Sequence, residues 1–275
     1  MNYNFLVPID FTEASVNALK SAYFTGIELG NTTVHLIHIA EEKREEKEDL
    51  AKLDALVKAH EVEGVSSQTT VRTGELFEEI KAASELLNID MVYLGTHGLS
   101  GLQYVFGSRA LKMVTQSKVP FVIVQEETEQ KTVSNIAVPI DFAAEDKQQL
   151  DVLAIVANTY NAKVSLFAAH PADEYSANAV KRNVAFAKKH LDSRKIENQV
   201  YEAQGSQDFF REFLHFAQEI QADLISMVNH QESGFINLLG SNFDQNIITN
   251  DAKIPVIIIN PKDLNTSGEM FGVYS

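Results

Sequence analysis

Phe5-Leu-Val-Pro-Ile-Asp-Phe11, close to the start of the chain, returns 131 residues later as Ile136-Ala-Val-Pro-Ile-Asp-Phe142. Two further landmarks repeat in the same order, at offsets of 133 and 135 residues: Gly107-Ser108 with Gly240-Ser241, and Ser117-Lys-Val-Pro-Phe-Val-Ile-Val124 with Ala252-Lys-Ile-Pro-Val-Ile-Ile-Ile259. Solenoid repeats have periods of about 20–50 residues, so a period this long indicates a duplicated domain. The sequence therefore predicts two copies of one fold in tandem.

A polar, charged stretch at 125–134 separates the two copies, as expected of a linker between two apolar strands. We expect one domain over residues 1–131 and a second over 132–262. A tail at 263–275 has no clear periodicity, and the sequence leaves open whether it is disordered or docks on its own or another subunit.

Strand-like and helix-like segments alternate in both halves. In the first half the pattern predicts strands near 4–9, 33–40, 66–72, 90–95 and 120–125, and helices near 12–29, 44–63, 75–88 and 108–117. In the second half it predicts strands near 135–140, 163–168, 197–203, 223–228 and 255–259, and helices near 144–159, 175–192, 207–221 and 241–251. This alternation is typical of a parallel sheet covered by helices on both faces. With right-handed crossovers it favours an α/β fold of two tandem doubly wound five-stranded domains.

Composition limits the class of function. The 275 residues include no cysteine, which excludes disulfides, thiolate metal sites and cysteine nucleophiles. No apolar run is long enough to cross a bilayer and the first residues do not resemble a secretory signal, so we expect a cytoplasmic protein with no membrane partner. The net charge is −15, with −8 on residues 1–131 (12 basic, 20 acidic) and −7 on residues 132–275 (11 basic, 18 acidic). Both halves repel a phosphate backbone, which argues against nucleic acid as a partner.

The candidate site lies at the carboxyl ends of the strands, where open α/β sheets bind ligands. Pro8-Ile-Asp10 follows the first predicted strand, and Gly95-Thr-His-Gly98-Leu-Ser-Gly101 follows the fourth. Gly107-Ser108-Arg109 then opens a helix, whose free N–H groups and dipole favour an anion. Glycines allow the close backbone approach that a phosphate needs, and Arg109 adds a positive charge.

Simpler roles stay open for most of these residues. Asp10 and Asp141 are also placed to cap helices, Ser108 can act as an N-cap, and glycines serve turns in many loops. His97 has the pattern of a loop residue, and His35 and His38 are expected in or beside the sheet without a metal. The charged run at 41–49 has the pattern of a solvated loop and helix start.

The tandem resembles two universal stress protein domains, on Val7-Pro-Ile-Asp10, His38-Ile39, Gly95-Thr-His-Gly98, Gly107-Ser108 and Lys118-Val-Pro-Phe-Val-Ile-Val124. The nucleotide-binding branch of that family has a loop of the form Gly-x2-Gly-x9-Gly-Ser/Thr. The resemblance implies that Asp10 and the backbone of Ile39 contact adenosine. It implies that Gly95, Gly98, Gly107 and Ser108 surround the phosphates. Pro8 would shape the first turn, and Arg109 would take part through its backbone or charge.

Both halves depart from the family loop. Gly98 and Gly107 are separated by eight residues where the family has nine. In the second half, aligned on Gly240-Ser241, the positions of Gly95 and Gly98 hold Val228 and Gln231, whose side chains would obstruct a close approach to the backbone. Glu232 adds unfavourable charge, and no convergent carboxylate makes His230 a metal ligand. We expect a degenerate second domain that serves as a structural pseudo-partner.

The resemblance implies a stress-response protein that binds ATP or a related adenine nucleotide, with or without Mg²⁺, through its first domain. Family members pair through the last strand, which implies an intramolecular pseudo-dimer here and leaves open a homodimer. A slow ATPase or phosphotransfer enzyme is the alternative, although no Gly-x4-Gly-Lys-Ser/Thr loop and no nucleophile–base pair is evident. A third possibility is a scaffold that binds an unknown protein partner and no nucleotide.

Overall fold

The computed structural model describes residues 2–40, 46–96, 117, 119–142, 147–205, 208–228, 248 and 250–259. It divides the chain into two compact units, Met1–Gln130 and Lys131–Lys262. The C-terminal tail at 263–275 lies outside the described residues.

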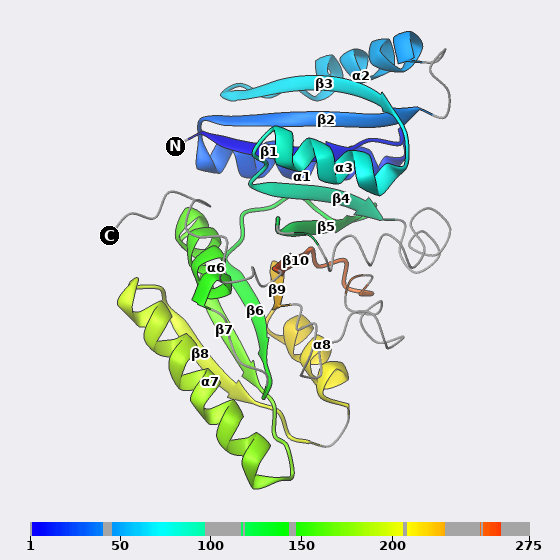
Figure 1. Ribbon diagram of the computed structural model, residues 1–275. Helices are drawn as coiled ribbons and strands as arrows, with labels where there is room; N and C mark the ends of the chain where they lie inside the picture. Colours follow the sequence, from blue (N-terminus) through cyan, green and yellow to red (C-terminus); the bar gives the residue numbers. More distant parts are fainter. Residues whose placement is uncertain are drawn as a thin grey trace. The chain divides into compact units, whose positions relative to one another are not determined.

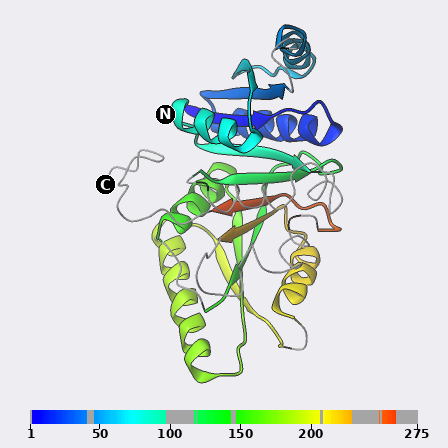
Figure 2. The same ribbon diagram turned by 45° about the vertical axis from the view of Figure 1, so that its right-hand side comes forward.

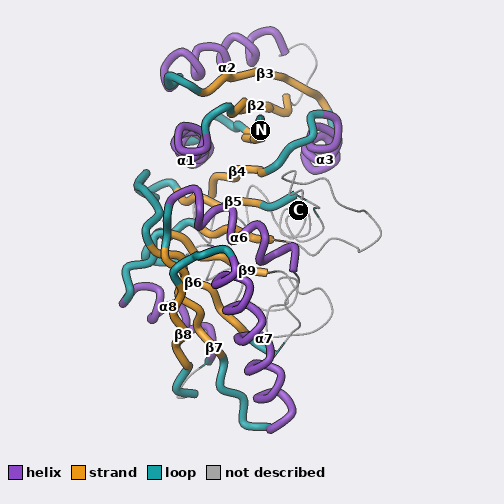
Figure 3. The backbone as a smooth tube through the Cα atoms, turned by 90° about the vertical axis from the view of Figure 1, so that its left-hand side faces the viewer, coloured by secondary structure: helices purple, strands orange, loops and turns teal. Residues whose placement is uncertain are grey.

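The first unit alternates strands and helices along the chain (Figure 1). Its elements are β1 (Tyr3–Pro8), α1 (Glu13–Leu29), β2 (Thr32–Ala40), α2 (Glu46–His60), β3 (Val65–Thr73), α3 (Leu76–Leu86), β4 (Met91–Thr96) and β5 (Phe121–Gln125). The strands are parallel in the order β3-β2-β1-β4-β5, which confirms the doubly wound arrangement. Figure 3 shows α1 and α3 on opposite faces of this sheet. The predicted helix near 108–117 falls almost entirely on residues that are not described.

The second unit repeats the order. Its elements are β6 (Asn135–Ile140), α6 (Lys147–Tyr160), β7 (Lys163–Ala168), α7 (Glu174–Ser193), β8 (Asn198–Glu202), α8 (Phe209–Glu219), β9 (Leu224–Val228) and β10 (Val256–Ile259). The strands are parallel in the order β8-β7-β6-β9-β10. Helices α7 and α8 lie on opposite sides of the strands (Figure 2). The helix expected near 241–251 falls mostly outside the described residues.

Burial explains which runs became central strands. All six residues of the inner strand β4 are buried, because helices cover both faces of a parallel sheet. The edge strand β3, by contrast, alternates half-buried and exposed residues along most of its length. The apolar spacing of α3 likewise places Ile80 and Ala83 in the core.

The strand register makes the two units comparable position by position. Gly95 pairs with Val124 in the first unit, and Val228 pairs with Ile259 in the second. Since Val124 and Ile259 end the matched apolar repeats, the position of Gly95 corresponds to that of Val228. The same comparison from β1 and β6 matches His38-Ile39 with Ala168-Ala169.

Candidate functional site

The candidate site of the first unit lies where the strand order reverses, between β1 and β4. The ladder pairs Phe5 with Met91 and Leu6 with Val92, at the middle of β1 and the start of β4. From this pair the chain continues in opposite directions across the sheet, because β2 lies on the far side of β1 and β5 lies on the far side of β4. Ligands of open α/β sheets bind at the carboxyl ends of strands that diverge in this way.

Asp10 is exposed at the end of β1. Its carboxylate accepts hydrogen bonds from the main-chain N–H of Thr12 at 3.0 Å and from the Thr12 hydroxyl at 2.5 Å. The N-cap of α1 is Thr12, whose hydroxyl accepts from the N–H of Ser15 at 3.3 Å. The alternative in which Asp10 caps this helix is therefore wrong: Asp10 braces the turn before the cap.

Phe11 follows with a left-handed backbone, φ 63°, which a residue with a bulky side chain rarely adopts. Its ring is 36% exposed and lies 4.7 Å from the His38 ring, centroid to centroid. The ammonium group of Lys52 lies over the Phe11 ring, 5.8 Å from its centroid. Neighbouring structure thus supports the strained backbone, as is common at functional sites.

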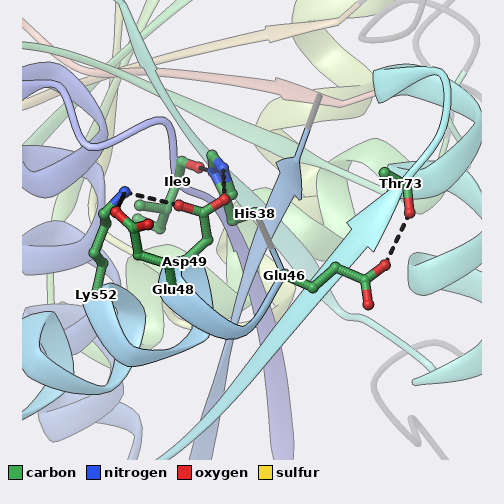
Figure 4. Close-up of polar contacts among 7 residues, drawn as sticks. All are labelled: Ile9, His38, Glu46, Glu48, Asp49, Lys52 and Thr73. Carbon is green, nitrogen blue, oxygen red and sulfur yellow. Dashed lines mark hydrogen bonds and ion pairs between the residues drawn. The ribbon is translucent and has the colours of Figure 1, made fainter. Parts of the chain in front are cut away.

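His38 lies near the end of β2, and its side chain reaches the residue that follows β1 (Figure 4). Its Nδ1 lies 2.7 Å from the carbonyl oxygen of Ile9. Because a carbonyl can only accept, Nδ1 carries the hydrogen. The other ring nitrogen, Nε2, lies 3.6 Å from Oδ2 of Asp49, close enough for an ion pair when the ring is protonated.

Asp49 contradicts the expectation of a fully solvated charged run at 41–49. It is buried, 6% exposed, and its Oδ1 accepts from Lys52 Nζ at 2.9 Å. Helix α2 turns this residue inward toward His38, while Glu48 stays exposed. Glu46, at the start of the same helix, accepts from the Thr73 hydroxyl at 3.0 Å and ties α2 to β3. Residues 41–45 lie outside the described part of the chain.

The main-chain N–H of Ile39, next to His38, differs from its counterpart in the second unit in its hydrogen bonding. In the second unit the matched residue, Ala169, donates to the carbonyl of Ile140 at 2.9 Å and continues the ladder between strands. In the first unit the matched carbonyl, that of Ile9, is taken by His38, and no described backbone bond joins Ile39 N to it. This N–H therefore lies near the carboxyl end of β2, without the ladder bond that its counterpart Ala169 makes.

Gly95 is required by helix packing. A Cβ at this position would lie 2.2 Å from the carbonyl oxygen of Ala14 and 2.6 Å from the nitrogen of Ser15. The first turn of α1 therefore rests directly on the backbone at the end of β4. We predicted Gly95 near a phosphate, and the described contact gives it a separate structural reason.

The matching edge of the second unit is filled by its own side chains. Asp141, the counterpart of Asp10, is 1% exposed, and its carbonyl accepts from the Asn183 side chain at 2.9 Å. Phe142 packs against a buried cluster of Ala168, Ala169 and Val180, along with other apolar side chains. The strand order is the same in both units, but the space beside the strand ends is apolar and occupied in the second.

Comparison with known families matches the first unit to one of them. Residues 1–125 match the model of the universal stress protein family. The first unit is therefore similar to a universal stress protein domain.

Solved structures extend the likeness in fold to both units. A universal stress protein from Archaeoglobus fulgidus DSM 4304 matches with a TM-score of 0.72 and 18% identity, over 94% of this chain and 98% of its own. A protein of unknown function from Pseudomonas aeruginosa PAO1 matches with a TM-score of 0.62 and 15% identity, over 94% and 93%. The cytoplasmic domain of a prokaryotic cation chloride cotransporter matches with a TM-score of 0.55 and 13% identity, over 94% and 95%. Such identities show the fold alone. No curated protein matches the chain in sequence.

Four predicted site residues of the first unit fall on segments that are not described: Gly98, Gly107, Ser108 and Arg109. The same holds for His97, which was expected to be a loop residue. In the second unit the same holds for Gln231, Glu232, His230, Gly240 and Ser241. The structure brings together Pro8, Asp10 and Ile39, at the ends of β1 and β2. Sequence reasoning did not assign His38 a role at the site, although its adjacency to Ile39 was the available signal.

The described residues form neither a metal-binding cluster nor a membrane-spanning helix. Among the described residues, no group of three or more His, Asp or Glu side chains is placed to hold a metal ion. None of the described helices is long and apolar enough to span a bilayer.

Proposed function

We propose that the first unit binds ATP or a related adenine nucleotide, in a cytoplasmic stress-response protein. Asp10 and the main chain of Ile39 hold the adenosine, with Pro8 shaping the turn between them. Gly95 shapes the start of the glycine-rich segment. Gly98, Gly107, Ser108 and Arg109 lie around the phosphates.

The observation that carries this proposal is the main-chain N–H of Ile39. His38 donates to the carbonyl of Ile9, and the ladder bond that Ala169 makes in the second unit has no counterpart among the described backbone bonds of Ile39. A donor at the edge of a sheet, beside the exposed carboxylate of Asp10, suits the ring nitrogens and hydroxyls of a nucleoside. A buried or half-buried N–H without a partner costs free energy, which a bound base would recover.

The second unit is proposed as a structural pseudo-partner. Its matching donor is already paired with Ile140, and Phe142 packs where a ligand would enter. The sequence adds Val228 and Gln231 at the two glycine positions.

A direct experiment tests the nucleotide proposal. The purified chain is denatured and any released nucleotide is identified by mass spectrometry. ATP is then titrated into nucleotide-free protein by calorimetry, with and without Mg²⁺. Gly98→Val is expected to abolish binding, because a branched side chain blocks the backbone approach to phosphate. The matched control in the second unit, Gln231→Ala, is expected to bind as the parent does.

Other outcomes decide between the alternatives. Absence of binding in the parent protein would overturn the proposal and favour an interaction scaffold. Equal loss of binding in both variants would show that the assignment of the nucleotide site to the first unit alone is wrong. ATP turnover that disappears in Asp10→Ala while binding is retained would favour a slow ATPase.

A further inference from the structure

Helix α7 of the second unit carries a stripe of aromatic and basic side chains on its outer face. Tyr175, Arg182, Phe186 and Lys189 stand at positions i, i+7, i+11 and i+14, which fall within one narrow arc of a helix with 3.6 residues per turn. All four are exposed; Tyr175 is 82% and Phe186 is 43% exposed. We name these four residues the α7 stripe.

The α7 stripe is not part of the core of the unit. The same helix packs through a different set of residues: Ala179, Val180, Ala187, His190 and Leu191. Phe186 has one described ring neighbour, the His190 ring at 6.4 Å, and Tyr175 stands near the start of the helix with most of its surface in water. Two large rings held in solvent at one face of a helix are a typical mark of a docking surface.

The charge of this region is opposite to that of the chain. Six of the eleven basic residues of the second half lie between 181 and 195, a segment with one acidic residue, Asp192. Arg194 is paired with Asp151, and Lys188 lies 3.6 Å from Asp192. Lys181, Arg182 and Lys189 form no ion pair with any residue in the described part of the chain. Three cations therefore stay available on a protein of net charge −15.

We propose that the α7 stripe binds a short acidic peptide segment of a partner protein. Apolar side chains of the peptide contact the Tyr175 and Phe186 rings, and its carboxylates pair with Arg182 and Lys189. The stripe is about 21 Å long at 1.5 Å per helical residue, which about six or seven extended residues span. This site is separate from the proposed nucleotide site and does not depend on it.

Charge complementarity favours a short peptide over an extended polyanion. Nucleic acid and anionic bilayers present charge over a wide area, and the remaining acidic surface would be repelled from them. A short segment brings only a few negative charges, which the stripe neutralises. Arginine and aromatic side chains are also enriched among the residues that dominate protein–protein binding energy.

The test uses the full chain and a fluorescein-labelled peptide of about ten residues, rich in Glu and carrying two Leu spaced to reach both rings. Fluorescence anisotropy is expected to show binding that weakens with salt. A peptide with Gln in place of Glu is expected to bind at least about tenfold more weakly. Arg182→Glu with Lys189→Glu is expected to abolish binding, and so is Tyr175→Ser with Phe186→Ser.

Matched controls lie in the first unit. Lys58→Glu with Lys81→Glu changes the charge by the same amount on exposed residues of α2 and α3, and Leu86→Ser removes a side chain that is 70% exposed. Both are expected to bind the peptide as the parent does. Circular dichroism confirms that each variant is folded.

Four outcomes would overturn the proposal: no binding of the peptide by the parent, equal loss in the control variants, peptide binding unaffected by the stripe variants, or stripe-dependent binding of a single-stranded oligonucleotide or of phosphatidylserine vesicles in place of the peptide. Stripe-dependent self-association in sedimentation, without peptide binding, would also overturn it, since the occupant would then be a second copy of the chain.

Discussion

At the end of β2, the first unit holds the His38 ring between the Ile9 carbonyl and Asp49, with Phe11 against it. At the matched place the second unit holds Ala168, and Phe142 packs inward on it. A single change from an imidazole to a methyl group accompanies a change from a polar edge to an apolar, filled one. The comparison teaches that two copies with one strand order and register can differ in polarity at a few positions beside the strand ends.

The second difference concerns how closely the first helix approaches the sheet. In the first unit a Cβ at position 95 would lie 2.2 Å from the Ala14 carbonyl oxygen, so the seat of α1 depends on glycine. The matched residue in the second unit is Val228, on β9. A valine side chain is incompatible with the helix placement of the first unit.

The largest expected effect comes from giving the first unit the residue of the second. Gly95→Val should lower the free energy of unfolding by about 3 kcal/mol or more, because the backbone of α1 must move. Urea denaturation followed by circular dichroism measures this. The control is Gly26→Ala, whose Cβ would meet side-chain carbons of Val65 and Thr32 at 3.1–3.3 Å and no backbone atom among its three nearest neighbours; we expect a change within about 1 kcal/mol. Similar small changes in both would contradict the described packing of α1.

The reciprocal exchange at the end of the second strand should have the next largest effect. Ala168→His places a polar ring in an apolar cluster at a position that is 4% exposed, and should lower the free energy of unfolding by about 2–4 kcal/mol. His38→Ala should cost about 1 kcal/mol, since it removes one hydrogen bond.

His38→Ala also tests the proposed role of Ile39. With the Ile9 carbonyl released, the Ile39 N–H can complete the ladder bond, and ATP affinity measured by calorimetry should fall several-fold. Unchanged ATP affinity in this variant would show that His38 does not influence nucleotide binding.

The two matched aspartates should differ in what they affect. Asp10→Asn should weaken ATP binding about tenfold, because a charged hydrogen-bond acceptor becomes neutral. Its amide oxygen still accepts from Thr12, so the unfolding midpoint should change little. Asp141→Asn, in the second unit, should leave ATP affinity as in the parent. A loss of affinity in Asp141→Asn of the same size would show that the second unit binds nucleotide too.

The smallest expected effect is the pH dependence of stability that His35 of the first unit contributes. Burial lowers the pKa of His35, whose Nε2 lies 3.3 Å from the Asn4 side-chain oxygen. The unfolded chain, with a His pKa near 6.5, then takes up a proton where the folded chain does not. Stability is therefore complete above about pH 6.5 and falls as the pH drops through the lowered pKa of the folded state.

The second unit supplies the substitution that tests this pH dependence. Ser165 stands at the position of His35 and contacts Asn135 as His35 contacts Asn4. His35→Ser should reduce the loss of stability between about pH 7.5 and about pH 5.5, measured by urea denaturation. Part of the slope should persist, because burial and Lys20 also lower the pKa of His60. An identical slope in parent and variant would rule out His35 as a contributor.

Much of the fold could be predicted from the chain alone. Alternating apolar strands and amphipathic helices leave few topologies once crossovers are right-handed, and the expected strands match the observed ones to within two residues at each end. The resemblance to a known family implied roles for Asp10 and Ile39, and these roles stay predictions. The strand and helix assignments, by contrast, rest on local pattern and chain order.

Other features could not be predicted because they depend on contacts between segments distant in sequence. Asp49 belongs to a charged run that predicts solvent exposure, yet its position on α2 turns it toward His38. Gly95 has the pattern of a loop glycine, yet the first turn of α1 packs on it. Neither neighbour is visible in a one-dimensional pattern.

The sequence by itself determined the duplication, the parallel sheet in each copy and the loss of both glycines in the second copy, since these follow from periodicity and residue type. Only the tertiary structure decided how the copies differ at their open edge. Whether a carbonyl at a strand end meets an imidazole or a neighbouring N–H depends on side chains that converge across strands, and that convergence fixes which donors are left for a ligand.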